Sequence, residues 1–183
     1  HTLGIAHSKH HNAHHSITEN QMDYIDLHTH STASDGTLTP TELVQAADKM
    51  GLRALALTDH DTTAGIGEAV QAAKDSNLEF VPGCELSVVS NSYRLHILGL
   101  WLPEKPGVLE DKLKELREYR HNRNHIILEM LRENGVAVEY EQIQEISGQG
   151  SVGRPHIARF LLENKHVSSI QEAFDRYLGP KGK

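Results

Sequence analysis

Apolar residues between positions 22 and 103 follow two different periods. Short, almost wholly apolar runs are typical of buried strands in a parallel sheet, and stretches with apolar residues at helical spacing separate them. We expect strands at Tyr24–His28, Ala54–Thr58, Glu79–Val81, Glu85–Val89 and Arg94–Trp101. The third of these is expected to end at Pro82-Gly83, and a turn is expected around Asn91-Ser92. Helices are expected at Pro40–Met50 and Thr63–Asp75. Alternation of strands and helices predicts a mainly parallel α/β sheet or barrel, whose functional site lies at the carboxyl ends of the strands.

The pattern changes after Pro103 and Pro106, and no strand-like run of comparable strength follows. Helical spacing then predicts one long charged helix and three shorter ones. They are expected at Val108–Asn134, Tyr140–Ile146, Pro155–Asn164 and Ser169–Leu178. We therefore interpret residues 22–103 as the N-terminal part of an α/β barrel and residues 104–183 as a helical insertion or second domain.

Residues 1–21 hold six of the fourteen histidines but have no apolar periodicity, so we expect a disordered, His-rich tail. Hydrophobic residues make up 38% of the chain and charged residues 23%. No run approaches the ~18 apolar residues that a membrane-spanning helix needs, which excludes that class. The single cysteine, Cys84, excludes an intrachain disulfide framework and favours a reducing, cytoplasmic location.

The net charge of −7 is unevenly distributed along the chain. Residues 1–103 contain 5 Lys/Arg and 12 Asp/Glu, whereas residues 104–183 contain 13 of each. An acidic first part with many histidines suits a cation site, and a second part with most of the basic residues can meet an anionic substrate. Ordinary solvated helices would explain the same charges.

The strongest local signal is Asp26-Leu27-His28-Thr29-His30 at the end of the first predicted strand. The strand period places Asp26, His28 and His30 on one face, so two imidazoles can converge on a metal while Asp26 accepts a ring N–H. Asp35, in the polar loop that follows, can fold back over the same strand end. The alternative is a chance His-x-His followed by a simple Asp-Gly turn.

Later strand ends carry further candidates. Asp59-His60-Asp61 follows an apolar strand directly, where a solvated turn is the alternative explanation. Glu85 brings a carboxylate to the end of the third strand, and His96 lies in an apolar strand where an unpaired imidazole would be costly to bury. Cys84 more often packs as a small apolar residue than it binds metal.

The predicted helical region has its own candidates for binding an anion. Arg154, His156 and Arg159 surround a helix N-terminus, and Arg120 and Arg123 are three residues apart on the long helix. Guanidinium groups beside a helix N-terminus favour phosphate. The alternative for Arg120 and Arg123 is pairing with acidic neighbours on a solvated helix.

The runs DLHTHSTASDGTLTP, ALTDHDT, VPGCELS and HILGL resemble, in order and spacing, the opening motifs of the PHP (polymerase and histidinol phosphatase) family. More narrowly, the chain is similar to the TrpH branch, which includes the exoribonuclease RNase AM and nucleoside 3′,5′-bisphosphate phosphatases. The resemblance extends from about Tyr24 to Lys183. It implies a distorted (βα)₇ barrel, partial in this chain, with a helical insertion and metal ions at the strand ends.

The resemblance also implies a ligand set for two to three ions, with Mn²⁺ preferred and Zn²⁺ or Fe²⁺ as alternatives. His28 and His30 would hold a first ion, Glu85 would bridge to a second held by His96, and Asp35 with His60 would hold a third. Family ligands from later His-Pro-Gly and Ser-Asp-x-His motifs do not occur in this sequence. We therefore expect the chain to be the N-terminal part of a longer protein.

These expectations favour a metal-dependent phosphoesterase that acts on nucleotides or on RNA 5′ ends, with His60 or Asp61 assisting proton transfer. Aromatic residues make up 5% of the chain and there are no Lys/Arg runs, so neither a long stacking channel nor a DNA-binding motif is indicated. The alternatives are a small-metabolite phosphatase of the histidinol phosphate type and a non-catalytic metal-binding or interaction domain. The oligomeric state stays open.

Overall fold

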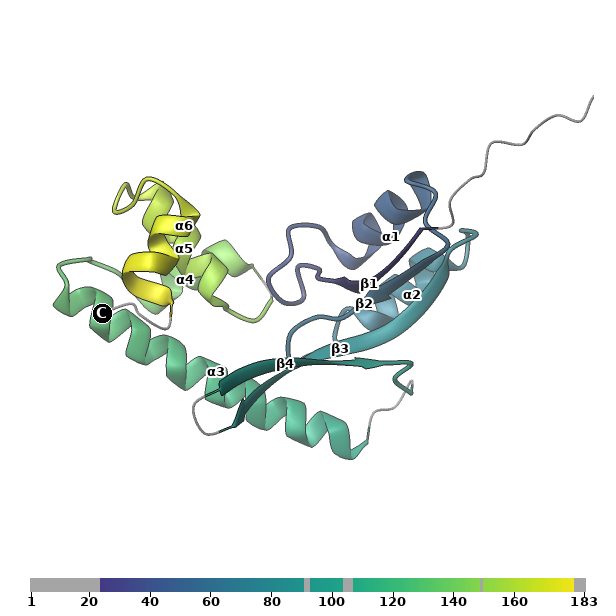
Figure 1. Cartoon of the computed structure of the whole chain (residues 1–183), viewed down its shortest axis with the longest axis horizontal. Helices are drawn as coiled ribbons and strands as arrows, with labels where there is room; N and C mark the ends of the chain where they lie inside the picture. The colour runs from purple at the N-terminus through teal and green to yellow at the C-terminus, as the bar shows by residue number, and fades with distance from the viewer. Residues whose placement is uncertain (1–23, 91–92, 104–106, 149, 180–183) are drawn as a thin grey trace, which may run out of the picture.

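A computed structural model describes residues 24–90, 93–103, 107–148 and 150–179. The predicted tail at residues 1–21 and the predicted turn at Asn91-Ser92 lie outside the described residues. A curled sheet with two helices on it lies at one end of the molecule, and a group of helices lies at the other (Figure 1). Within the described part of the chain, no helix is long and apolar enough to cross a membrane.

The sheet has four strands in the order β1-β2-β3-β4. Their bounds are β1 Ile25–Thr29, β2 Ala54–Leu57, β3 Glu79–Ser90 and β4 Tyr93–Leu100. β1, β2 and β3 pair in parallel, as the alternation of strands and helices predicts. β4 runs antiparallel to β3, which a two-stranded hairpin permits without a crossover helix.

The predicted strand end at Pro82-Gly83 is wrong, because both residues lie inside the 12-residue strand β3. β3 pairs with β2 up to Pro82 and with β4 from Gly83 onward. At this change of partner, a Cβ on Gly83 would lie 2.9 Å from the carbonyl oxygen of Gly99 and 3.0 Å from that of Leu57. Gly83 therefore permits a close approach of three strands rather than a turn.

Helices α1 (Pro40–Lys49) and α2 (Ile66–Ala73) pack against each other and against the sheet. α1 begins with a capping box, in which Thr39 Oγ1 accepts the Glu42 N–H and the Glu42 carboxylate accepts the Thr39 N–H. Apolar residues of both helices and of the sheet form the first hydrophobic core. Its buried members are Val44, Ala47, Leu55, Leu57, Ala69 and Leu78.

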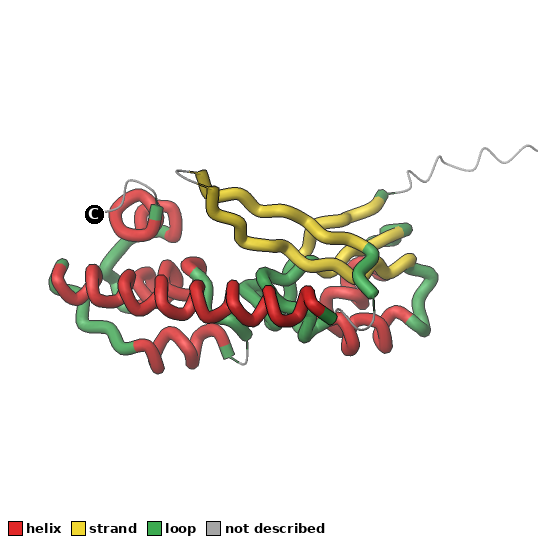
Figure 2. Tube along the Cα trace, turned by 90° about the horizontal axis from the view of Figure 1, so that it is seen from below, coloured by secondary structure: helices red, strands yellow, loops and turns green. Residues whose placement is uncertain are grey.

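The remaining helices form a second hydrophobic core. They are α3 Val108–Glu133, α4 Tyr140–Ser147, α5 Arg154–Glu163, α6 Ile170–Ala173 and the π-helical turn η1 Phe174–Leu178. The second half of α3 packs with α4 to η1, and we call this group the helical lobe. α3 extends from the helical lobe along the sheet (Figures 1 and 2). The single helix predicted at Ser169–Leu178 is instead divided between α6 and η1.

Candidate metal centre

The loop after β1 is held in place by one buried carboxylate. Asp59 accepts hydrogen bonds from the backbone N–H of Ser31, the hydroxyl of Ser31 and the hydroxyl of Ser34, each at 2.7 Å. Burial raises the pKa of Asp59, and the serine hydrogen bonds oppose that rise. The loop also turns tightly, because a Cβ on Gly36 would lie 2.2 Å from the carbonyl oxygen of His30. These constraints fix the segment that carries His30 and Asp35.

Backbone pairing brings the end of β2 against β3. The Glu85 N–H donates to the Asp59 carbonyl at 3.1 Å, and the Asp61 N–H donates to the Glu85 carbonyl at 3.0 Å. His60 therefore lies beside Glu85, with which it forms an isolated parallel bridge. The side chains predicted at separate strand ends are brought together in this way.

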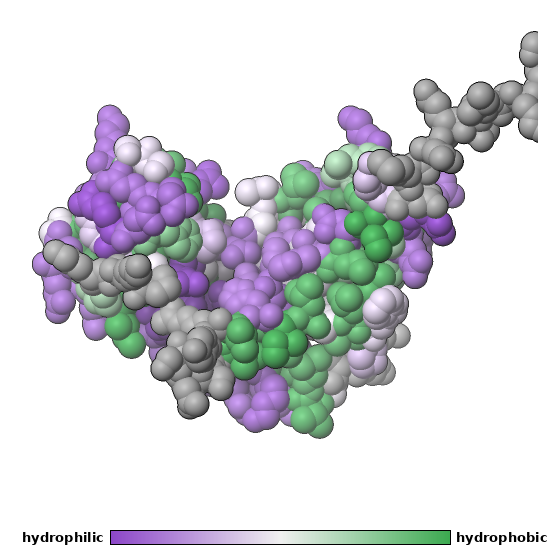
Figure 3. All heavy atoms as spheres, in the orientation of Figure 1, coloured by the Kyte–Doolittle hydropathy of each residue, from purple (hydrophilic) through white to green (hydrophobic). Residues whose placement is uncertain are grey.

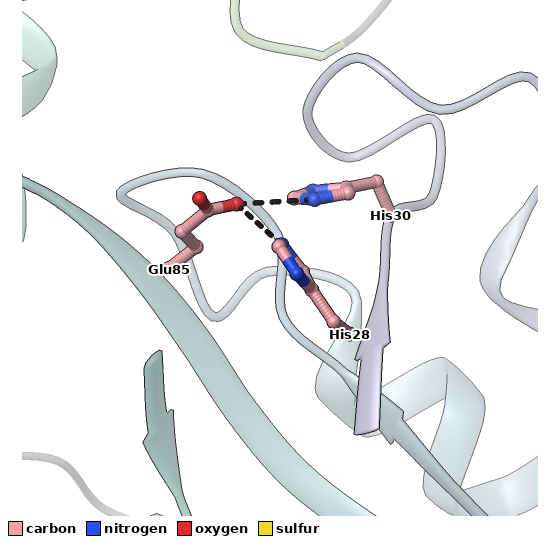
Figure 4. A group of neighbouring side chains, drawn as sticks. All are labelled: His28, His30 and Glu85. Carbon is pink, nitrogen blue, oxygen red and sulfur yellow. Dashed lines mark hydrogen bonds and ion pairs between the residues drawn. The ribbon is translucent and has the colours of Figure 1, made fainter. Parts of the chain in front are cut away.

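Glu85 is the centre of the cluster and is 2% exposed. Its Oε2 lies 3.0 Å from Nε2 of His28, 3.1 Å from Nε2 of His30 and 3.4 Å from Nδ1 of His60. Figure 4 shows how the rings of His28 and His30 both point at this oxygen. The other oxygen, Oε1, contacts Nδ1 of His96.

Asp35 closes the cluster on the side of the loop. Its Oδ1 lies 3.8 Å from Nδ1 of His30, and its Oδ2 lies 3.6 Å from Nε2 of His60. All six residues predicted to bind metal thus form three overlapping groups, each with ligand atoms within 4.8 Å of one another. The groups are His28/His30/Glu85, His30/Asp35/His60 and His60/Glu85/His96.

The donor atoms of this cluster fit a divalent metal. Nδ1 of His30 and Nδ1 of His60 are buried and make no hydrogen bond with any described residue. Burial lowers the pKa of His60 to about 4, so its imidazole is neutral and can donate a lone pair at neutral pH. Burial opposes ionisation of Glu85, but the His28 hydrogen bond and the nearby imidazoles outweigh it and lower the pKa of Glu85. A carboxylate shared among imidazoles is a ligand set for divalent transition metals.

Two predicted site residues contact each other. Asp61, predicted to assist proton transfer, is fully buried and has a φ of 54°. It accepts hydrogen bonds from the Ser87 N–H at 2.8 Å and from the guanidinium of Arg120. Arg120, predicted to bind substrate, also donates to the Ser87 hydroxyl at 2.8 Å. Burial raises the pKa of Asp61, but these hydrogen bonds outweigh it and lower the pKa overall.

The other predicted substrate residues divide between two cavities. Arg123 and Arg154 line a cavity of about 220 Å³ together with His60 and His96. Hydrophilic residues gather in the hollow between the sheet and the helical lobe (Figure 3). Arg154 also donates to the Leu178 carbonyl at 3.1 Å.

His156 and Arg159 line a different cavity, on the other side of Asp35. His156 is buried, and its Nδ1 accepts the Gly153 N–H at 2.9 Å. Arg159 forms an exposed ion pair with Glu163 at 2.7 Å. Three of the five predicted anion-binding residues, Arg120, Arg123 and Arg154, therefore line the cavity beside the metal cluster, and Arg120 is held there by the buried carboxylate of Asp61.

Sequence reasoning missed some contacts and misassigned one. Asp26 accepts the backbone N–H of His28 at 3.1 Å, not a ring N–H as predicted. The structural role of Asp59 was not predicted, although Ser31 and Ser34 in the following loop could have indicated a hydroxyl-binding carboxylate. Cys84 packs in the interior as expected, where burial raises the pKa of its thiol to about 12.

Comparisons with known proteins agree on one family. A family model for the PHP domain matches residues 26–179. A 5′-3′ exoribonuclease of Haemophilus influenzae is 41% identical over 154 residues, covering 84% of this chain and 56% of that protein. A 3′,5′-nucleoside bisphosphate phosphatase of Chromobacterium violaceum is 36% identical over 160 residues, covering 87% of this chain and 56% of that protein.

The fold is also similar to a solved structure. A Bifidobacterium adolescentis protein inferred to be a metal-dependent phosphoesterase superimposes with a TM-score of 0.80 and 29% identity, over 88% of this chain and 57% of that one. This likeness confirms the predicted α/β fold as part of a PHP-like barrel. The chain spans about half the length of the curated relatives it matches.

Proposed function

Because the chain belongs to the PHP domain family, we propose that it supplies the metal site of a phosphoesterase that hydrolyses phosphate esters of nucleotides or of RNA 5′ ends. The observation that carries this proposal is the sharing of Glu85 among four imidazoles. A carboxylate in that position can bridge two cations, and the flanking histidines can complete each coordination shell.

We assign the metal ligands as the family resemblance implies. His28 and His30 would hold one ion, Glu85 would bridge to a second held by His96, and Asp35 with His60 would hold a third. Mixed nitrogen and oxygen ligands fit Mn²⁺, Zn²⁺ or Fe²⁺, and the family resemblance favours Mn²⁺ among them. Two to three ions per complete site are proposed.

Bound divalent ions supply Lewis-acid polarisation of a phosphoryl oxygen and make a water molecule more acidic. The residues of the chain orient the reactants. Arg123 and Arg154 line the same cavity as His60 and His96, so their guanidinium groups can hold a phosphate oxygen beside the ligand cluster. His60 is neutral at pH 7, so a ring nitrogen of His60 that is not bound to a metal can also accept a proton.

The cavity supports recognition of a terminal group rather than a long strand. At about 220 Å³ it has room for little beyond one or two phosphates and the sugar between them. The relatives named as an exoribonuclease and as a nucleoside bisphosphate phosphatase both have names that describe reactions at a terminal group, which a cavity of this size can hold. We therefore propose a nucleotide or an RNA 5′ end as the substrate, in a cytoplasmic setting.

Phosphate release with Mn²⁺ tests the proposal. The assay uses the chain and the product of the complete reading frame that encodes it, with a 3′,5′-bisphosphonucleoside, a 5′-phosphorylated RNA and histidinol phosphate as substrates. We expect the complete product to hydrolyse one of the first two in preference to histidinol phosphate, and a Glu85→Gln variant to lose that activity. Preference for histidinol phosphate would favour a small-metabolite phosphatase. No hydrolysis of any substrate would favour a non-catalytic metal-binding domain.

A further inference from the structure

Two histidines form a pair on α3 outside the candidate metal centre. His121 and His125 are four residues apart, so they lie on the same face of the helix. Their Nε2 atoms are 3.0 Å apart, and their ring centroids are 4.5 Å apart. Neither residue belongs to the three ligand groups around Glu85.

The separation of the two Nε2 atoms suits a shared metal ion. Zinc–imidazole bonds of about 2.0–2.1 Å at a tetrahedral angle place two ligand nitrogens about 3.3 Å apart. The observed 3.0 Å is a few tenths of an ångström shorter, which a small rotation of either ring can supply. Two histidines at this helical spacing are a recognised zinc-binding arrangement.

Tyr140, the first residue of α4, holds both rings in place. Its hydroxyl lies 3.0 Å from Nδ1 of His121, which leaves Nε2 of that ring for a metal. Its ring stacks on His125 with centroids 4.7 Å apart and an interplanar angle of 18°. Burial raises the pKa of Tyr140, so its neutral hydroxyl can accept the Nδ1–H of a metal-bound His121.

The pair is open to solvent on the side of a large cavity. His121 is exposed, and it lines a cavity of about 780 Å³ together with Tyr140, Glu118 and Gln144. Water molecules from this space can complete the coordination of an ion that has two protein ligands. The cavity that Asp35, His60 and His96 of the candidate metal centre line includes neither histidine.

We propose that His121 and His125 chelate a second kind of metal ion through their Nε2 atoms, with Tyr140 as the positioning residue. A site with only imidazole nitrogens from the protein favours Zn²⁺, Cu²⁺ or Ni²⁺ and discriminates against Mn²⁺ and Mg²⁺. Because Tyr140 begins α4, the bound ion stabilises the junction between α3 and α4. This site does not depend on the proposed phosphoesterase function.

A Zn²⁺ titration of the ¹⁵N-labelled chain, followed by the imidazole nitrogen signals, tests the proposal ring by ring. We expect the Nε2 signals of His121 and His125 to shift together at one Zn²⁺ concentration. The ring-resolved signals separate this site from the histidines around Glu85 and from those of residues 1–21.

Three variants make the test specific. His125→Ala is expected to weaken Zn²⁺ binding at His121 about tenfold or more, because a chelate becomes a single ligand. Tyr140→Phe keeps the stacked ring but removes the hydroxyl, and a loss of about tenfold is expected from the weaker orientation of His121. His166→Ala, at a histidine outside the pair, is the matched control and is expected to change nothing at His121.

Two results would overturn the proposal. The first is that neither ring responds to Zn²⁺ while the histidines around Glu85 do, which would leave only a hydrogen bond between the two rings. The second is that His121 binds Zn²⁺ equally well in His125→Ala, which would mean that the two rings do not share an ion.

Discussion

The buried carboxylate of Glu85 contacts imidazoles from three parts of the sheet, namely β1, the turn after β2, and β4. The sequence indicated His28, His60 and Glu85 as polar side chains at the ends of apolar strands, and His96 as a polar side chain within one. What it could not indicate was the position of Glu85 within a long strand. Gly83 was interpreted as the end of a strand, whereas β3 changes its pairing partner there and continues through Glu85.

His156 gives a pH prediction at the residue scale. Burial lowers the pKa of His156 below the ordinary value of 6.5. Between the two pKa values, the unfolded state binds a proton at His156 that the folded state does not bind. The contribution of His156 to the unfolding free energy is therefore fully present above pH 6.5 and is lost as the pH falls from 6.5 toward the pKa of the folded state. We expect the metal-free chain to lose more unfolding free energy between pH 7.5 and pH 5.5 than a His156→Gln variant does.

Urea denaturation at the two pH values measures this difference. Glutamine at position 156 keeps an acceptor for the Gly153 N–H but does not titrate. Other titrating groups, including His60, contribute equally to both proteins. An identical pH dependence for the two proteins would show that the burial of His156 does not affect its titration.

At the scale of elements, α3 is attached to the sheet by a buried ion pair. Arg120 on α3 binds Asp61 in the turn after β2, and Arg117 donates to the Asp61 carbonyl at 2.9 Å. Sequence reasoning identified Arg120 and Asp61 as separate functional candidates. It could not pair them, because they are 59 residues apart and no local period links a helix to a distant turn.

Breaking this pair should destabilise the protein more than breaking an exposed one. In Arg120→Met, the carboxylate of Asp61 stays buried without its charged partner, so we expect a loss of about 3–5 kcal/mol of unfolding free energy. In Arg159→Ala, the exposed pair with Glu163 is lost, and we expect a change of about 0–1 kcal/mol. Urea denaturation at pH 7.5 compares the two.

A second variant separates the charge effect from lost packing. Arg120→Met combined with Asp61→Asn removes both charges and is expected to recover part of the stability lost by Arg120→Met alone. If Arg120→Met costs no more than Arg159→Ala, the buried pair does not anchor α3. If the double variant recovers nothing, packing of the Arg120 side chain explains the loss.

At the scale of the whole molecule, two hydrophobic cores are connected by α3, and the cavity that contains Arg123 and Arg154 lies between them. Alternating periods predicted the strands and helices that form the first core, and helical spacing predicted the helices that form the second. The placement of the helical lobe over the strand ends depends on long-range contacts such as the hydrogen bond of 3.4 Å from the Ser151 N–H to the Ala33 carbonyl. No local pattern in the sequence predicts that contact.

This arrangement predicts that Arg154 governs the choice of substrate. Losing a charge-assisted contact costs about 1.5–3 kcal/mol, or roughly ten- to a hundred-fold in kcat/KM. In the complete protein, we expect Arg154→Ala to show that loss with a 3′,5′-bisphosphonucleoside and little loss with the matching 3′-monophosphate, because only the former has a second phosphate to hold. Arg159→Ala, in a different cavity, is the control. Equal losses on both substrates would assign Arg154 to folding or to catalysis in general.

The central claim is that Glu85 and its surrounding histidines bind a divalent metal, and Mn²⁺ binding by the chain tests it most directly. The free Mn²⁺ signal in electron paramagnetic resonance gives the affinity, and Mn²⁺ binds isolated imidazoles too weakly for the histidines of residues 1–21 to dominate. We predict that Glu85→Gln weakens Mn²⁺ binding at least about tenfold, whereas Glu163→Gln, at an exposed carboxylate, leaves it unchanged. Equal Mn²⁺ affinity in Glu85→Gln and in the unmodified chain would contradict the account.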